Sequence, residues 1–473
     1  QGVQLPQASA WDAAAGLSGN EHRASPVLYD RRQPKRCRSR GKSWYQGCAV
    51  YRRQFVGMCK GKYRLDKGGV PVRIGIFENI MTPGGHEVDF DRILVEELQQ
   101  RGHEVSFYVP ENFEFNFDYQ VPVVKLGGEV VSYSNVRGVK KLFYAMKREY
   151  NRQKWYAQLY EAAYRKDIDA LIVPTSTYRY LRALNKNILR RSNIPIIFVL
   201  HGINPKEAPK FLREAKKLLP YKNIKPVVLT FVNHIFGHKL PNIYTIYPPA
   251  YTARDIEFVP SVEKKDVLTI GFFGQYRREK RLRDFLEVYV KGNYTRKVRL
   301  FVQGSTMHPE DAEDFEQIIQ EYKAHPEIEF LHKGLIGAEW QKALAEIDVL
   351  LMPYSAPRYL YHWGGMLFTA IGFQKPVVAS NDINPEVFAK FDIGMTFKSG
   401  DMGDLQRVLE TFINTYDDKV NDYAQGLAQA AKKFSPESFA HRIEAIFTGE
   451  YHTINPKAMP ADKVEAAIEN KKE

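Results

Sequence analysis

Residues 331–394, and within them residues 370–380 (AIGFQKPVVAS), carry the clearest structural pattern of this chain. An apolar helix end, a polar break, a Lys-Pro pair and a short apolar strand follow one another here. Proline fixes its own φ and moves Lys375 out of the helical region, so a helix ends and a strand begins at this point. Residues 347–354 (IDVLLMPY) predict a second buried strand, and residues 355–365 (SAPRYLYHWGG) predict a loop between the two strands. Open α/β sheets bind ligands at loops of this kind.

Short apolar strands alternate with amphipathic helices in two blocks of the chain, and a polar, proline-containing stretch at 248–266 separates the blocks. This alternation predicts the α/β class, with two doubly wound Rossmann-like domains that face a central cleft. Predicted strands lie at 72–77, 103–109, 121–124, 169–174, 194–200, 226–232 and 243–246, and again at 267–273, 298–302, 328–331, 347–352, 377–380 and 395–397. We expect a leader at 1–70, an N-terminal domain at 71–255, a C-terminal domain at 256–450 and a charged tail at 451–473.

The positive charge of the chain is concentrated near its beginning. The net charge of the 473 residues is +13, and residues 1–70 hold fourteen Lys or Arg against four Asp or Glu. A nucleic-acid-binding tail is one interpretation of residues 31–42 (RRQPKRCRSRGK). We favour a basic, disordered leader and expect no specific nucleic acid partner.

Cysteine usage and hydropathy narrow the class of protein further. All three cysteines lie in the leader, spaced by eleven residues, which is not a zinc-ligand pattern. No run reaches the ~18–20 apolar residues that span a bilayer, and residues 1–20 have no signal-peptide pattern. We therefore expect a cytoplasmic protein, either free or attached to the inner face of the membrane.

Two glycines in the first block have a physical reason to touch a phosphate group. Gly84 and Gly85 follow the strand at 72–77 and precede an amphipathic helix at 87–101. Their freedom of φ lets backbone amides and the helix N-terminus approach a diphosphate closely. An ordinary turn between strand and helix is the alternative.

Residues 271–280 (GFFGQYRREK) combine an apolar strand, a glycine turn and a lysine near the start of a helix. This stretch resembles the first strand, the glycine turn and the donor-phosphate lysine of the GT-B glycosyltransferases, specifically the family-four (group 1) enzymes that use nucleotide-sugar donors. Residues 298–304, 328–352 and 370–380 follow in the family's order, and residues 74–105 resemble its first half. The resemblance covers about four-fifths of the chain and implies that the first domain binds the acceptor and the second the donor.

The resemblance assigns expected roles to individual residues. It places Gly274 at the glycine turn, Gln275 where the family often has arginine, and Lys280 at the donor diphosphate, where a fixed cation stabilises the leaving group. Lys333 and Gly334 match the turn that lines the base, although a plain strand-ending turn is nearly as good an interpretation. His201 ends a first-half strand at the position where related enzymes hold a histidine near the reacting sugar, so it is the catalytic candidate.

One departure from the family pattern bears on the mechanism. The family usually carries two glutamates separated by seven residues, and the alignment places Tyr361 and Thr369 at these positions. Residues 353–381 contain no Asp or Glu. We expect Thr369, Arg358, Tyr361 and the Gly364-Gly365 backbone to bind the donor instead, with His362 and Trp363 beside them. A different donor sugar would also fit this departure, and so would a loss of catalysis.

These observations lead to one functional hypothesis and one alternative. We expect a metal-independent glycosyltransferase of the hexosyltransferase type, which moves a sugar from a nucleotide-diphosphate sugar to an unknown glycan or lipid-linked acceptor in cell-surface polysaccharide assembly. No cofactor beyond the nucleotide sugar and no metal are expected, because the Asp-x-Asp sequences at 89–91 and 167–169 do not follow strands. The alternative is a catalytically silent nucleotide- or sugar-binding protein of the same fold.

A basic and aromatic segment in the first block suggests where an acceptor could be found. Residues 137–154 hold seven Lys or Arg and one Glu, interleaved with Leu, Phe and Tyr. Such a helix could rest on an anionic membrane surface. A solvated helix face is the competing interpretation.

Overall fold

The computed structural model of the chain describes residues 71–80, 86–131, 138–231, 240–260 and 266–451. All the helices and strands named below belong to one unit, Val70–Glu473. The predicted leader, all but the first residue of the predicted tail, and the predicted phosphate-binding Gly84 and Gly85 lie outside the described residues. The domain boundaries therefore stay predictions.

The first half of the unit builds a parallel sheet. Its strands lie in the order β3-β2-β1-β4-β5-β6-β7, and each pair of neighbours is parallel. Side chains of β4 and β5 are buried along their whole length, as expected when helices cover both faces of a sheet. The strands are β1 (Arg73–Phe77), β2 (Glu104–Pro110), β3 (Val123–Leu126), β4 (Ala170–Val173), β5 (Ile196–Leu200), β6 (Ile224–Leu229) and β7 (Tyr244–Ile246).

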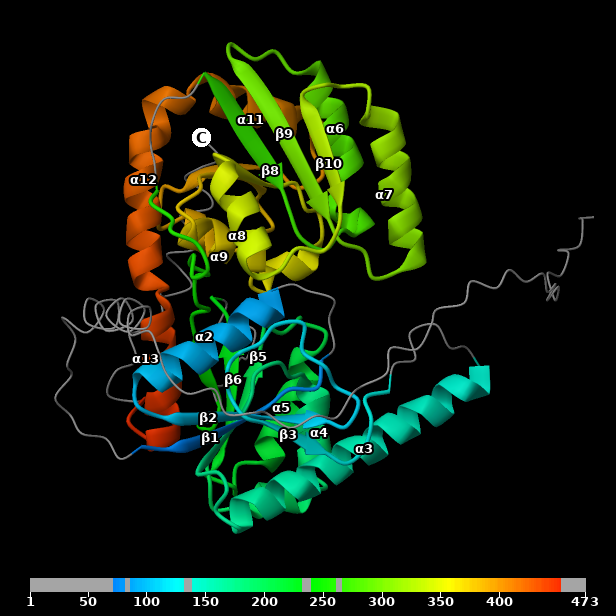
Figure 1. Cartoon of the computed structure of the whole chain (residues 1–473), viewed down its shortest axis with the longest axis vertical. Helices are drawn as coiled ribbons and strands as arrows, with labels where there is room; N and C mark the ends of the chain where they lie inside the picture. Colours follow the sequence, from blue (N-terminus) through cyan, green and yellow to red (C-terminus); the bar gives the residue numbers. More distant parts are fainter. Residues whose placement is uncertain (1–70, 81–85, 132–137, 232–239, 261–265, 452–473) are drawn as a thin grey trace, which may run out of the picture. The chain divides into compact units, whose positions relative to one another are not determined.

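The second half repeats this arrangement with a second parallel sheet, in the order β10-β9-β8-β11-β12-β13 (Figure 1). Both sheets reverse their strand order beside their first strand, which is the doubly wound pattern. The predicted α/β class with two Rossmann-like sheets is confirmed. The strands are β8 (Val267–Phe272), β9 (Lys297–Gly304), β10 (Ile328–His332), β11 (Val349–Met352), β12 (Val377–Ser380) and β13 (Gly394–Phe397). Each observed strand overlaps a predicted one.

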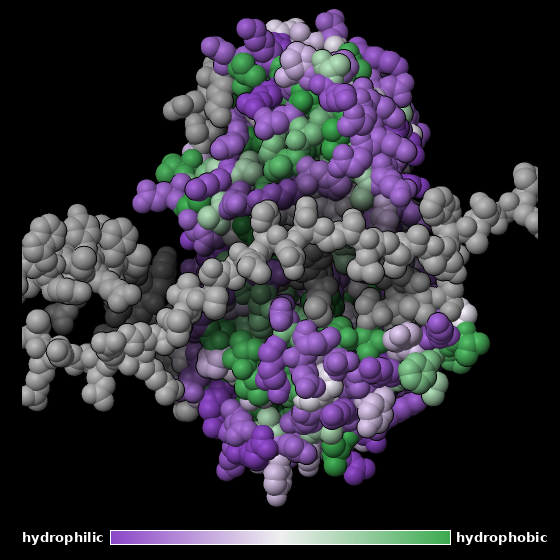
Figure 2. Space-filling view, turned by 45° about the vertical axis from the view of Figure 1, so that its right-hand side comes forward, coloured by the Kyte–Doolittle hydropathy of each residue, from purple (hydrophilic) through white to green (hydrophobic). Residues whose placement is uncertain are grey.

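Helices connect the strands in both halves. In the first half they are α2 (His86–Gln100), α3 (Gly138–Tyr164), α4 (Tyr178–Leu184), the 3-10 turn η1 (Ile188–Arg191) and α5 (Ala208–Lys217). In the second half they are η3 (Arg278–Lys280), α6 (Leu282–Lys291), α7 (Pro309–Tyr322), α8 (Gly337–Glu346), η4 (Pro357–Leu360), α9 (Gly365–Gly372), α10 (Pro385–Phe388), α11 (Met402–Asn414), α12 (Tyr416–Lys433) and α13 (Pro436–Thr448). Hydrophilic side chains cover most of the described surface in the view of Figure 2.

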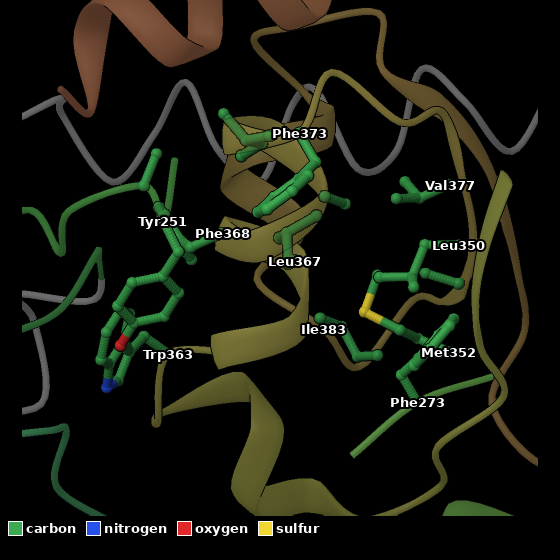
Figure 3. Packing of buried hydrophobic residues seen from close by; sticks show 14 of the residues in the cluster. Tyr251, Phe273, Leu350, Met352, Trp363, Leu367, Phe368, Phe373, Val377 and Ile383 are labelled. Carbon is green, nitrogen blue, oxygen red and sulfur yellow. The ribbon is translucent and has the colours of Figure 1, made fainter. Parts of the chain in front are cut away.

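The break after α9 follows the physical argument made from the sequence. Lys375 does leave the helix, and its ammonium bonds to the carbonyls of Ala345 and Ile347 at 3.0 and 2.6 Å. A short turn then leads into β12, and the buried Leu367 and Phe368 lie on α9, with Phe368 on the side of Tyr251 and Trp363 (Figure 3). Helix, turn and strand therefore form one packed element that positions the start of α9.

The last helix, α13, returns to the first half and packs against α2. Phe439 lies with its ring centroid 5.3 Å from that of Phe90, and Arg101 of the first half bonds to Glu444 at 2.8 Å. The chain therefore passes between the halves twice, and the backbone of Ala250 bonds to that of Phe434 at 2.7 Å where the two passages meet.

The polar stretch predicted as a linker is fastened to both halves. Asp255 receives two bonds of 2.7 Å from the guanidinium of Arg92 on α2 and one of 2.9 Å from Gln341 on α8. Arg254 pairs with Glu96 and Glu97 of α2. These ion pairs hold α2 near the first turn of α8.

Candidate functional site

The loops that follow strands of both sheets line one cavity of about 620 Å³. Residues after β4 and β5 meet residues after β8 and β11 in this cavity. The first sheet reverses its strand order between β1 and β4, and the second between β8 and β11. Open α/β sheets bind their ligands at this place. Lining residues from the first half include Asp89, Thr175, Ser176, Thr177, Tyr178, His201, Gly202 and Glu207, and those from the second include Gly274, Gln275, Arg277, Lys280, Trp340, Tyr354, Arg358, His362, Trp363, Gly364, Gly365, Met366 and Thr369.

The glycine turn after β8 brings Lys280 to the wall of this cavity. Gly274 has φ +98°, and its amide donates to the side-chain oxygen of the buried Gln303 at 2.9 Å. A Cβ at Gly274 would lie 3.6 Å from the ammonium nitrogen of Lys280 and 3.4 Å from the sulfur of Met366. Only glycine avoids the strain of this φ, so the turn keeps the backbone next to the lysine.

Lys280 is a buried cation in an apolar and electropositive setting. Lys280 is only 7% exposed, and its ammonium nitrogen lies 4.7 Å from the ring centre of Tyr354. Its hydrogen bond to the Phe273 carbonyl is long, at 3.4 Å. Burial, helped by the charges of Arg277 and Arg358, lowers the pKa of Lys280 to about 7. An anion bound in the cavity would offset the free-energy cost of burying this charge.

The two arginines near Lys280 share one carboxylate. Arg358 pairs with Glu279, and Arg277 lies 3.8 Å from the same carboxylate while also bonding to Gln275 at 3.0 Å. Three cations therefore stand against Glu279 at this wall, which leaves an excess of positive charge for a polyanionic ligand.

The N-terminus of α9 supplies backbone donors to the same cavity. The amide of Gly364 is held by Asn384 at 2.8 Å, and Gly365 and Met366 line the cavity at the first turn. The first amides of a helix have no partner within the helix, and the helix dipole favours an anion there. Thr369 also lines the cavity, with its hydroxyl bonded back to the Gly365 carbonyl at 3.0 Å.

The predicted loop at 355–365 reaches across to the first half. His362 donates from Nδ1 to the carbonyl of His201 at 3.1 Å, and its backbone forms an antiparallel bridge with Gly202. Burial lowers the pKa of His362, so it is neutral at pH 7. Gly202 has φ +111°, and a Cβ there would lie 2.3 Å from the carbonyl oxygen of Tyr361.

His201 lies at the cavity wall as predicted for a residue at the end of β5. Its Nε2 is 2.9 Å from the Pro174 carbonyl, and its ring packs edge-on against Phe90 and Trp363 at 4.7 and 5.4 Å. Trp363 itself is 6% exposed and packs on Tyr251 and Phe368, which favours a core role over stacking on a sugar (Figure 3).

Asp89 belongs to one of the two Asp-x-Asp sequences for which no role was expected. It does lie within the helix α2, yet its side chain lines the main cavity and two smaller adjoining ones. Burial raises its pKa to about 7. Asp and Glu are common in the first turn of any helix, so this position carries no signal in the sequence alone. A carboxylate is therefore present at the cavity although residues 353–381 have none.

The structure does not bring every predicted residue to the main cavity. Lys333 is on the surface, where it pairs with Glu339 at 2.8 Å. Gly334 lines a smaller pocket that shares Asp89, Gly274, Gln275 and Trp340 with the main one. Tyr361 approaches Gly202 by its backbone and is not among the lining residues.

Two further features of the described residues concern metal binding and membrane-spanning helices. They contain no cluster of His, Cys, Asp and Glu that could hold a metal ion. In the part of the chain that the structure describes, no helix combines the length and the apolar run that crossing a bilayer takes.

Two Rossmann-like sheets whose switch points share one electropositive cavity define a GT-B fold. Residues 253–434 match the family described as glycosyl transferases group 1. The resemblance predicted for the second half is thereby confirmed. No curated protein sequence matches the chain.

Solved structures resemble the chain over both halves. HepE of Anabaena, solved with UDP and glucose, is 15% identical, with a TM-score of 0.58 over 80% of this chain and all of its own. Sucrose-phosphate synthase of Thermosynechococcus elongatus is 14% identical, with a TM-score of 0.60 over 81% of this chain and all of its own. A glycosyltransferase of Rickettsia africae is 13% identical, with a TM-score of 0.59 over 81% and 99%. These likenesses establish the GT-B fold.

Proposed function

We propose that the chain is a glycosyltransferase that moves a sugar from a nucleoside-diphosphate sugar to a hydroxyl group of a glycan or lipid-linked acceptor. The observation that carries this proposal is Lys280, a buried cation at the wall of the cavity shared by the two halves. Burying a cation without a carboxylate partner is costly, and a bound diphosphate offsets that cost. The group 1 match of the donor half and the UDP held by HepE support the same ligand class.

The diphosphate is proposed to lie between the Gly274 turn, Lys280 and the first turn of α9. Charge develops on the leaving diphosphate as the bond from the anomeric carbon to the phosphate oxygen breaks, and fixed cations and amides stabilise that charge. This proposal uses no metal ion and no cofactor besides the nucleotide sugar. The smaller pocket at Gly334 is proposed to take the nucleoside, and Thr369 and Gln275 to contact the donor.

Asp89 and His201 are proposed to face the reacting sugar. Both line the cavity from the first half, opposite the cations of the second half. A carboxyl group with a pKa about 7 is suited to take the proton of an acceptor hydroxyl at neutral pH. In that step the acceptor oxygen bonds to the anomeric carbon, and the diphosphate leaves with the electron pair of the broken bond.

Thermal unfolding of the full chain with UDP, GDP, dTDP and CMP tests the diphosphate site. A hundredfold excess over Kd adds about 2.7 kcal/mol to the free energy of unfolding. We expect one diphosphate to stabilise the wild type and Lys291→Ala, a variant of an exposed lysine on α6, but not Lys280→Ala. Equal stabilisation of all three proteins would overturn the placement of the diphosphate.

A catalytically silent binding protein is the second candidate, favoured by the missing carboxylates at 353–381. Arg358 and His362 line the cavity beside Lys280, as an enzyme needs, whereas Tyr361 does not. Release of UDP from UDP-glucose and other UDP-sugars separates the two candidates. Binding of a donor without any release of UDP, either to water or to an added glycan mixture, would favour the silent protein.

The cell-surface context remains part of this proposal, as does the hexosyl nature of the transferred group. Both rest on the family resemblance of the donor half. A cytoplasmic place, or one at the inner face of the membrane, is where nucleotide sugars would be available to the cavity.

A further inference from the structure

The first turns of α3 expose a row of large apolar side chains. Their exposed fractions run from 64% to 85%. Exposed fractions this high are unusual for five large apolar residues on one helix. A contiguous exposed hydrophobic patch marks a site of interaction. The residues are Val139, Leu142, Phe143, Met146 and Tyr150, and we call them the α3 stripe.

The α3 stripe lies on one side of the helix. At about 100° per residue, these five positions fall within an arc of about 100°. The buried residues of α3 lie on the opposite side, where Trp155 bonds to the Gly128 carbonyl at 2.9 Å and Asn151 to the Glu129 carbonyl at 2.8 Å. The helix therefore has one face that packs on the first half and a second apolar face that no described residue covers.

The N-terminal end of α3 extends away from the strands of the first sheet (Figure 1). Its later turns are fixed to α4, where the ring of Tyr180 lies 4.5 Å from the guanidinium of Arg152 and its carbonyl accepts a bond from Tyr156 at 3.3 Å. Because Tyr178 at the start of α4 lines the main cavity, the stripe is connected to the cavity by one short helix.

Positive charge accompanies the stripe. Between residues 138 and 154 the helix carries six Lys or Arg and a single acidic residue, Glu149, which pairs with Arg152 at 2.7 Å. At about 100° per residue, Lys140, Lys147 and Lys154 lie beside the α3 stripe, whereas Lys141, Arg148 and the buried Arg152 lie on the other side of the helix. Lys147 also pairs with Glu129 at 3.4 Å. Lys140 and Lys141 are both exposed in the first turn. Apolar and aromatic side chains flanked by cations are what an anionic bilayer surface accepts.

We propose that the α3 stripe lies on an anionic membrane surface and holds the cavity near acceptors in that surface. The sequence alone left a solvated helix face as the competing interpretation, and five exposed large apolar residues argue against it. The membrane contact stands on α3 alone, whereas the assignment of membrane-bound acceptors rests on the proposed function.

Co-sedimentation of the full chain with vesicles tests the contact. Vesicles of phosphatidylcholine are compared with vesicles that contain about one-third phosphatidylglycerol, at low and high salt. We expect binding to the anionic vesicles, weakened at least tenfold by Leu142→Ser with Phe143→Ser, by Lys140→Glu with Lys141→Glu, and by high salt. The control, Val259→Ser with Val267→Ser, removes exposed apolar side chains from another part of the chain and should bind as the wild type does.

Residues 1–70 are also basic, so vesicle binding that all variants share would overturn the proposal. A wild-type dimer without vesicles that the Leu142 and Phe143 variant converts to a monomer would also overturn it, because a second copy would then cover the stripe. Stabilisation by UDP is measured on the same variants. Loss of vesicle binding with UDP stabilisation intact separates the membrane contact from the nucleotide site.

Discussion

Replacing Lys280 by methionine should make the unliganded protein more stable and abolish its stabilisation by a nucleoside diphosphate. The pKa of Lys280 falls from 10.5 to about 7 on folding because the ammonium is buried beside two arginines. A shift of one unit corresponds to about 1.4 kcal/mol, so the charged lysine costs about 5 kcal/mol at pH 6. Methionine fills similar space without a charge.

Two contacts of the ammonium reduce this gain. The ammonium lies 4.7 Å from the Tyr354 ring centre and donates to the Phe273 carbonyl. Losing both contacts costs the variant about 2 kcal/mol, so Lys280→Met should raise the free energy of unfolding by about 3 kcal/mol in total.

The gain depends on pH with a defined sign. The unfolded chain keeps the Lys280 proton up to about pH 10.5, whereas the native protein releases it near pH 7. The free energy of unfolding of the wild type therefore rises with pH between these values, and the advantage of Lys280→Met shrinks over the same window.

Thermal unfolding at pH 6 and pH 9.5, with and without UDP, measures both effects. Lys291→Met is the matched control, because Lys291 is exposed on α6 and pairs with Glu287 at 2.7 Å. It should change the stability by less than about 0.5 kcal/mol and keep the nucleotide effect. A Lys280→Met protein that is less stable than the wild type at pH 6, or that UDP still stabilises, would refute the reasoning.

Three other substitutions, one of them with a matched control, test the site and the fold. Asp89→Asn should lower kcat by about 10²-fold or more and remove the acid limb of the pH profile near pH 7, read from steady-state rates between pH 5 and pH 9. Gly202→Ala puts a Cβ 2.3 Å from the carbonyl oxygen of Tyr361 and should weaken donor affinity in titrations. The control Gly102→Ala, with φ +87° and open space around the new Cβ, should lower the free energy of unfolding in urea by only about 1–2 kcal/mol. Phe439→Ala should cost about 3–5 kcal/mol in the same unfolding assay, because its buried ring packs on α2.

The strands could be predicted because parallel strands buried on both faces are continuous apolar runs in the sequence. The helix after Gly85 and the break at Lys375 also follow from local rules. Strand ends were less certain, and the sixth strand begins at Ile224 and not at Pro226 because a lysine at position 225 interrupts the apolar run without interrupting the pairing.

The cavity could not be assembled from the sequence, since its walls come from residues more than a hundred positions apart. Asp89 belongs to an Asp-x-Asp sequence inside a predicted helix, for which the sequence indicated no role, and only the fold brings it into one pocket with Trp340 of α8. Lys333 matched a family turn, but its side chain forms an ion pair with Glu339 at the surface. Trp363 sits next to the glycines of the site, yet the rings around it form part of the core.

The double passage of the chain near Ala250 and Phe434 limits how the cavity can open. A hydrogen bond of 2.7 Å joins these two passages, so neither backbone can turn independently of the other. Any opening of the cavity must therefore move both passages together.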